Sequence, residues 1–272
     1  MSYIISLCII LLVLTGLYLI LICPRIFHKP DDSALYGRHY AHRGLFDNKT
    51  QAPENSLNAF QKAVDAGYGI ELDVQLSKDG IPVVFHDASL KRMCGVDGNV
   101  WEYTLAELQE MRLADSEERI PTFQQVLDMV NGSVPLIIEY KLYVSKVHVC
   151  KKGNALLENY KGVYCIESFH PLALVWYKMH RPEIIRGQLS ENFMKHTKNK
   201  GKIELWMLKY LLSNVLTRPD FIAYHHEDKD NLSRRICRKL GALSVAFTIR
   251  SESEYRKAKN SFDLFIFESF IL

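Results

Sequence analysis

Two carboxylates lie two positions apart in a segment that is otherwise apolar. Glu71 and Asp73 belong to residues 69–76, which have the mostly aliphatic composition of a buried β-strand. Because side chains alternate across a strand, both carboxylates lie on one face. Burying two like charges without a partner is costly, and a divalent cation with oxygen ligands, such as Mg²⁺ or Ca²⁺, removes that cost. The pair therefore predicts a metal centre.

Histidines flank this segment on both sides. His42 precedes it and is followed by Arg43, whereas His86 comes after it and precedes Asp87. An imidazole titrates near neutral pH and can give or take a proton. Together with metal-bound carboxylates, the two histidines indicate acid/base chemistry on a phosphate ester.

A further pair of charges lies in another strand-like run, residues 135–141. Glu139 and Lys141 share one face of this run. Charged side chains within apolar strands are costly unless they are paired or bound to a metal. The joint pattern therefore favours one active site over unrelated loop charges.

These residues need a scaffold that brings the ends of several strands together. Strand-like runs occur at 39–42, 70–76, 135–141, 163–169, 184–189, 221–225, 243–249 and 264–267. Helical patterns lie between them at 54–66, 122–131, 144–159, 170–180, 202–216, 228–240 and 251–260. Eight strands alternating with helices predict a (β/α)8 TIM barrel, in which catalytic groups collect at the C-terminal ends of the strands. A doubly wound open sheet is the alternative.

One segment interrupts the alternation after the second strand. Residues 83–86 follow a Lys-Asp-Gly turn and predict a hairpin partner for that strand. Residues 87–120 then predict a small irregular insertion before the third strand.

The N-terminal segment is distinct from the rest. Residues 1–24 carry no charged side chain, and about 20 apolar residues in a helix span a bilayer. We expect a transmembrane anchor at 3–23, a linker at 24–37 and a barrel domain at 38–272. A cleaved signal peptide is the alternative, but a basic start and a small-residue cleavage site are missing. Positive charge lies only on the C-terminal side of the anchor, which predicts a single-pass protein with a cytoplasmic catalytic domain.

Composition limits the other possibilities. The chain has 272 residues, 48% hydrophobic and 24% charged, enough for one large globular domain with an appendage. Its net charge of +3 is too small to argue for nucleic-acid binding. Six cysteines without CxxC spacing show neither a disulfide framework nor a zinc pattern.

Several motifs, taken in order, resemble the glycerophosphodiester phosphodiesterase family. They are Ala-His-Arg-Gly at 41–44, Pro-Glu-Asn-Ser at 53–56, Glu-Leu-Asp-Val at 71–74, Val-Val-Phe-His-Asp at 83–87, Ile-Pro-Thr-Phe at 120–123 and Ile-Glu-Tyr-Lys at 138–141. The resemblance covers roughly residues 38–270 and is most specific in the N-terminal half.

The resemblance implies divalent-metal hydrolysis of glycerophosphodiesters to glycerol 3-phosphate and an alcohol. By motif, the implied roles are acid/base catalysis for His42 and His86, metal binding for Glu71, Asp73 and Glu139, and phosphate contact for Arg43 and Lys141. It also implies that the substrate's own neighbouring hydroxyl attacks phosphorus, giving a cyclic phosphate that is then hydrolysed.

Two positions depart from the family pattern. Phe247 stands where the family usually has Trp, and Glu268 stands where it usually has Asp. These changes bear on substrate preference more than on the metal centre.

Two other functions are alternatives to the hydrolysis of glycerophosphodiesters. They are a phospholipase D-like activity on lysophospholipids, which a membrane anchor favours, and a non-catalytic membrane-anchored binding barrel. Retention of the carboxylates and both histidines argues against the second.

Overall fold

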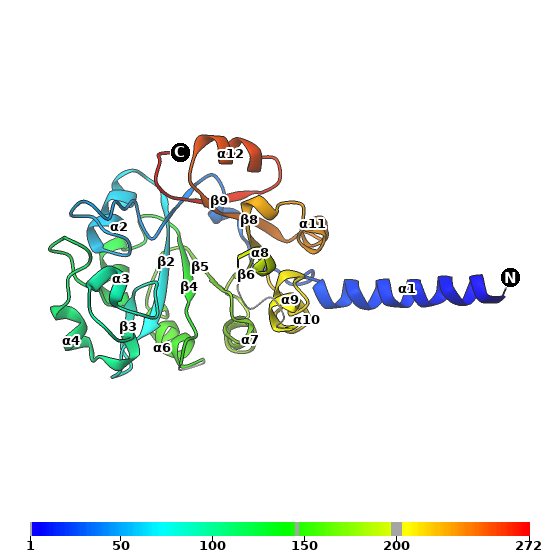
Figure 1. The fold of residues 1–272 in the computed structure, drawn as a ribbon, viewed down its shortest axis with the longest axis horizontal. Coiled ribbons are helices and arrows are strands. Elements are labelled where there is room, and N and C mark those ends of the chain that lie inside the picture. The colour runs from blue at the N-terminus through cyan, green and yellow to red at the C-terminus, as the bar shows by residue number, and fades with distance from the viewer. Residues whose placement is uncertain (1, 145–146, 197–202) are drawn as a thin grey trace.

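The computed structural model describes residues 2–144, 147–196 and 203–272 (Figure 1). Eight parallel strands form a closed barrel, in which β1 pairs with both β2 and β9. These strands are β1 (Tyr40–His42), β2 (Gly69–Leu76), β4 (Leu136–Tyr140), β5 (Tyr164–Ser168), β6 (Arg186–Ser190), β7 (Phe221–His225), β8 (Leu243–Ile249) and β9 (Leu264–Phe267). The predicted (β/α)8 barrel is confirmed, and the open sheet is excluded.

A short strand lies outside the parallel set. β3 (Pro82–Val84) pairs antiparallel with the last residues of β2, as the hairpin prediction required. The stretch predicted to be irregular contains short helices, namely α3 (Lys91–Cys94), η2 (Val100–Glu102) and α4 (Leu105–Glu110). They enclose a small apolar core of their own, so the insertion is a compact unit beside the end of β2. Helices this short leave little periodicity in a sequence.

Helices surround the barrel (Figure 1). They are α2 (Leu57–Asp65), α5 (Phe123–Val130), α6 (His148–Leu157), α7 (Pro171–His180), α8 (Phe193–His196), α9 (Ile203–Lys209), α10 (Asn214–Thr217), α11 (Leu232–Lys239) and α12 (Glu252–Ala258), with 3₁₀ turns η1 (Ser33–Leu35) and η3 (His226–Asp228).

Several helices are shorter than predicted, and two of the differences have a clear local cause. The helix predicted at 54–66 begins at Leu57, because Ser56 is extended and its side chain accepts a hydrogen bond from Ala59 N. The helix predicted at 202–216 is divided into α9 and α10. Leu211, between them, has a φ of 57°, which ends a right-handed helix. Residue 202 lies outside the described residues.

The barrel interior has an apolar floor and a charged upper layer. Tyr40, Ile137 and Cys165 belong to the apolar cluster inside the barrel. Two residues further along β4 and β5, on the same inward face, stand Glu139 and Glu167. The fold therefore supports buried carboxylates at the C-terminal ends of the strands from an apolar base.

α1 (Ser2–Ile22) extends away from the barrel (Figure 1). Tyr3–Ile22 has a mean hydropathy of 2.9, so α1 is long and apolar enough to cross a membrane. A signal sequence meets the same criteria, and α1 is a candidate for either. Its last turns contact the barrel, where Tyr18 Oη lies 2.8 Å from Ser233 Oγ and Ile22 is fully buried.

Candidate active site

Strand register brings charged side chains from four strands to one level. His42 is aligned with Glu71 across β1 and β2, and Asp73 is aligned with Glu139 across β2 and β4. Glu139 lies opposite Glu167 on β5. Because the parallel strands of a barrel end at the same rim, these groups meet there.

Three of the carboxylates form a group compact enough to hold a metal ion. One oxygen each from Glu71, Asp73 and Glu139 lies within 4.8 Å of the others, and all three residues are buried. Burial, with Asp73 and Glu167 nearby, raises the pKa of Glu71 well above its ordinary value. Burial also raises the pKa of Glu139. The cluster holds more negative charge than it can easily stabilise, which a cation would offset.

Cationic and amide groups contact this cluster. Lys141 Nζ lies 2.9 Å from Asp73 Oδ1 and 2.7 Å from Glu139 Oε1. Arg43 Nε lies 3.4 Å from Asp73 Oδ2, and Asn55 Nδ2 donates a hydrogen bond of 2.8 Å to the same oxygen. Burial opposes ionisation of Asp73, but Lys141 and the other cations nearby hold its pKa well below the ordinary value. Asp73 therefore stays ionised.

His42, at the end of β1, is held by a carboxylate from beyond β9. Its Nδ1 is hydrogen-bonded to Glu268, and Arg250 Nε donates to the other oxygen of Glu268 at 2.6 Å. His42 Nε2 lies 3.8 Å from Glu71 Oε2, so the second ring nitrogen faces the acidic cluster. Burial and the Arg43 charge lower the pKa of His42 to about 4. The imidazole is therefore neutral near pH 7.

His86, just after β3, is also held through Nδ1, which lies 2.6 Å from Asp87 Oδ1. Gln75 holds the backbone on both sides of His86, because its Nε2 donates to the carbonyls of Phe85 at 2.7 Å and Asp87 at 2.9 Å. Arg92 Nε, from the insertion, donates to Asp87 Oδ2 at 2.6 Å. The insertion thus helps to position the second histidine.

The turn after β1 requires its glycine. Arg43 and Gly44 both have positive φ, 57° and 83°. A Cβ at Gly44 would lie 2.8 Å from the backbone carbon of Ala59, so a larger residue would push the turn off α2. In this conformation Arg43 donates its backbone N–H to Glu71 Oε2 at 3.1 Å and its guanidinium to Glu54 Oε1 at 2.7 Å.

A cavity of about 280 Å³ opens over these groups. Six of the seven predicted site residues line it, namely His42, Arg43, Glu71, His86, Glu139 and Lys141. The seventh, Asp73, is fully buried beside them. Phe169 and Phe247, whose ring centroids are 5.9 Å apart and nearly perpendicular, give the cavity an apolar wall.

The structure adds two acidic residues for which the sequence suggested no role. Glu167 lines the cavity, and burial together with Glu139 raises its pKa well above the ordinary value. Its signal was the same as that of Glu139, a carboxylate inside an apolar strand. Glu54 binds both Arg43 and Arg92, and its signal was the Pro-Glu-Asn-Ser motif.

Hydrolysis of a phosphate ester needs positive groups for the anion and donors and acceptors of protons at the reacting oxygens. One cavity at the C-terminal rim of this barrel offers both, beside an acidic cluster suited to a cation. Fold and site together define the protein as a barrel phosphodiesterase.

Comparison with known proteins makes the family explicit. Residues 42–257 match the profile of the glycerophosphoryl diester phosphodiesterase family, and the chain belongs to this family. It is 41% identical over 237 residues to the glycerophosphodiester phosphodiesterase of Caldanaerobacter subterraneus, covering 82% of this chain and 90% of that protein. A mouse lysophospholipase D is 31% identical over 157 residues, which cover 53% of this chain and 48% of the mouse protein.

Solved structures show the same fold. An Oleispira antarctica phosphodiesterase in complex with the product sn-glycerol-3-phosphate superimposes with a TM-score of 0.68 at 27% identity, covering 86% of this chain and 93% of that one. The Thermotoga maritima glycerophosphodiester phosphodiesterase gives a TM-score of 0.65 at 28% identity, covering 85% and 95%. The chain described here is accordingly a phosphoric diester hydrolase.

Proposed function

We propose that this enzyme hydrolyses glycerophosphodiesters to sn-glycerol 3-phosphate and an alcohol by metal-dependent acid/base catalysis. The observation that carries the proposal is the meeting of Glu71, Asp73 and Glu139 within 4.8 Å, in the wall and floor of a cavity that also holds His42 and His86. The product-bound relative from Oleispira antarctica supports glycerol 3-phosphate as the product here.

The three clustered carboxylates fit a hard divalent cation, Mg²⁺ or Ca²⁺. They offer oxygen ligands, they are buried, and the raised pKa values of Glu71 and Glu139 reflect charge that a cation would stabilise. When bound, the cation supplies positive charge to the phosphoryl oxygens. Arg43 and Lys141 line the same cavity and supply further positive charge for the substrate phosphate.

The histidines divide the proton transfers between them. Each is held by a carboxylate at Nδ1, which leaves Nε2 as the reacting nitrogen. His42 is neutral near pH 7 and accepts the proton of the glycerol hydroxyl next to the phosphoester. His86 protonates the departing alkoxide. The cyclic phosphate formed in this step is then opened by water, with the histidine roles reversed.

The glycerol part of the substrate lies against Phe169 and Phe247, the apolar wall of the cavity. Similarity to the mouse lysophospholipase D supports a second candidate activity, the release of lysophosphatidic acid from lysophospholipids. Both reactions break the same bond, the one between phosphorus and the oxygen of the leaving alcohol.

We further propose that α1 anchors the enzyme in a membrane as a single span, followed by a linker and by a catalytic domain in the cytoplasm. The uncharged helix and the positive charges that follow it support this orientation. Protease accessibility of the barrel in sealed, oriented vesicles tests it. A mature protein that begins near residue 24 would show a cleaved signal instead.

The proposed activity is tested with the purified full chain in detergent. We expect release of choline and sn-glycerol 3-phosphate from glycerophosphocholine, and no release of choline from the 2-deoxy analogue, which lacks the attacking hydroxyl. Hydrolysis of the 2-deoxy analogue at a similar rate would contradict the cyclic route. The same preparation is assayed with lysophosphatidylcholine, so the two candidate activities are compared directly.

A further inference from the structure

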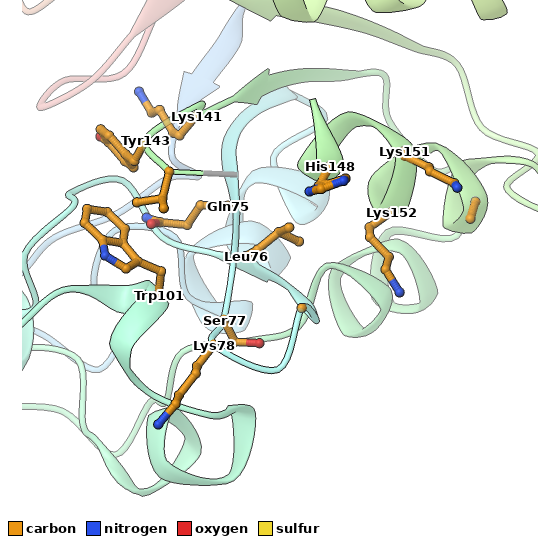
Figure 2. Close-up of a pocket in the computed structure, with 13 residues that line it drawn as sticks. Gln75, Leu76, Ser77, Lys78, Trp101, Lys141, Tyr143, His148, Lys151 and Lys152 are labelled. Carbon is orange, nitrogen blue, oxygen red and sulfur yellow. The ribbon is translucent and has the colours of Figure 1, made fainter. Parts of the chain in front are cut away.

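A second, larger cavity lies next to the catalytic one and plays no part in the proposed mechanism. It has a volume of about 690 Å³ and lies between the insertion, the end of β2 and α6 (Figure 2). Lys141 lines both cavities, so the two cavities lie next to each other, with the Lys141 side chain between them. A group attached to the substrate phosphate on the side away from the glycerol can extend into this space.

The charged side chains that line the larger cavity are all positive. Three exposed or rim lysines line it, Lys78, Lys151 and Lys152, and none of the described lining residues is acidic. Lys151 and Lys152 stand together on α6, and in the part of the chain that the structure describes neither is paired with a carboxylate. A cationic occupant would be repelled here and an anionic one attracted.

Aromatic rings form the end of the cavity nearest the catalytic residues. Trp101 of the insertion and Tyr143 lie with ring centroids 5.7 Å apart and planes tilted by 40°. Tyr143 Oη donates a hydrogen bond of 2.9 Å to the carbonyl of His86. The aromatic pair therefore connects the cavity to the histidine that protonates the leaving group, at the place where the leaving alcohol must lie.

One buried polar atom points to hydroxyl groups in the occupant. Gln75 is 2% exposed, and its Nε2 is fully used by the backbone on both sides of His86. Its Oε1 has no hydrogen-bond partner among the described residues, and Figure 2 shows the side chain directed toward Trp101 and Tyr143. An unsatisfied buried acceptor is costly, and a hydroxyl donor would satisfy it.

We propose that this cavity is the head-group site and that it selects hydroxyl-bearing alcohols that carry a negative charge. The inference rests on the proposed hydrolysis, because it places the leaving alcohol of that reaction. Aromatic walls alone would also suit a quaternary ammonium group. Lys78 is close enough to Glu107 to be partly offset by it, so Lys151 and Lys152 decide against a cation.

The test is a series of three substrates with one linkage and different head-group charge. Glycerophosphocholine is cationic at the head group, glycerophosphoglycerol is neutral, and bis(glycerophospho)glycerol carries a second phosphodiester. We expect kcat/KM to rise in that order. In the variant Lys151→Glu/Lys152→Glu, the preference for bis(glycerophospho)glycerol over glycerophosphoglycerol should fall about tenfold, as expected when two exposed charge contacts change sign.

The matched control is Lys62→Glu/Lys161→Glu, which makes the same change in net charge at exposed lysines away from this cavity. It should keep the wild-type preference. An unchanged preference in the Lys151→Glu/Lys152→Glu variant would overturn the inference while the hydrolysis itself stands. Hydrolysis of none of the three substrates would overturn both. Another outcome is a strong preference for lysophosphatidylcholine over the three substrates, equal in the wild type and in the Lys151→Glu/Lys152→Glu variant. That result would show that the cavity holds an acyl chain instead.

Discussion

At the scale of single residues, both histidines are hydrogen-bonded to a carboxylate through Nδ1. For one histidine the carboxylate comes from a distant part of the chain, and for the other it comes from the next residue. Glu268 holds His42, and Asp87 holds His86. This arrangement holds each ring in one orientation, so little reorganisation would be needed during the proposed proton transfer.

Replacing either histidine tests its role in proton transfer. His42→Ala and His86→Ala should each lower kcat by about 10²–10⁴, the usual size of a general acid or base contribution. The double variant should lose much less than the product of the two effects, because both residues serve one proton-transfer cycle. Thermal unfolding should change little, since these side chains lie at the rim. Turnover near the wild-type value in either single variant would remove that histidine from the mechanism.

Glu268 is hydrogen-bonded to His42, and we expect it to act as a positioning residue whose effect can be separated from that of His42. Its carboxylate favours the protonated imidazole, so Glu268→Gln should lower the pKa of His42. Protonation of His42 would then require a more acidic solution, and the acidic limb of kcat/KM should move to lower pH. Loss of the orienting contact should reduce kcat by about 10- to 100-fold. A pH profile identical to that of the wild type would show that Glu268 does not act through His42.

At the scale of secondary-structure elements, close packing between neighbouring strands holds the rim in place. Gly187 on β6 lies under Phe221 of β7, and a Cβ there would come within 1.9 Å of the Phe221 ring. The ring fills the barrel floor beneath the carboxylates.

Gly187→Ala should therefore destabilise the barrel by about 1–3 kcal/mol, the usual cost of overpacking. Adding Phe221→Leu should restore part of the loss, because the smaller side chain makes room for the new methyl group. The free energy of unfolding in urea measures both variants. A Gly187→Ala protein as stable as the wild type would show that the strands can move apart at no cost.

The sequence was sufficient to predict the strands but not every helix or every charge. All eight parallel strands were predicted, most of them from an apolar run between polar segments. The division between α9 and α10 was missed because Leu211 adopts a positive φ, which its residue type does not suggest. Glu167 carried the same signal as Glu139, a carboxylate inside an apolar strand, but only the strand register shows that the two stand opposite each other. Contacts between distant parts of the chain, such as His42 with Glu268, have no local signal.

At the scale of the whole molecule, the apolar helix and the barrel meet in a fixed contact. Asn214 Nδ2 donates to the carbonyl of Ile22 at 2.8 Å, and Arg218 Nη1 donates to the carbonyl of Cys23 at 2.8 Å. Arg25 Nη1 lies 3.6 Å from Asp220 Oδ1. The end of α1 and the residues after it therefore contribute to the packing of the barrel.

Two truncations measure that contribution. Deleting residues 1–17 removes most of α1 and keeps the contacts. Deleting residues 1–29 also removes the buried Ile22 and the carbonyl to which Asn214 Nδ2 donates. The shorter deletion should leave the membrane fraction and stay active. The longer one should be less stable by about 2–5 kcal/mol, the cost of losing a large buried side chain. Equal free energies of unfolding would show that the contact is not needed by the barrel.

The proposed hydrolysis depends above all on a divalent cation held by the rim carboxylates Glu71, Asp73 and Glu139. The most direct measurement is the release of sn-glycerol 3-phosphate from glycerophosphodiesters by the purified full chain, before and after removal of metal with a chelator. We expect loss of activity on chelation, recovery with Mg²⁺ or Ca²⁺, and no recovery in the variant Glu71→Gln/Glu139→Gln. Full activity in the chelated wild-type enzyme would contradict it.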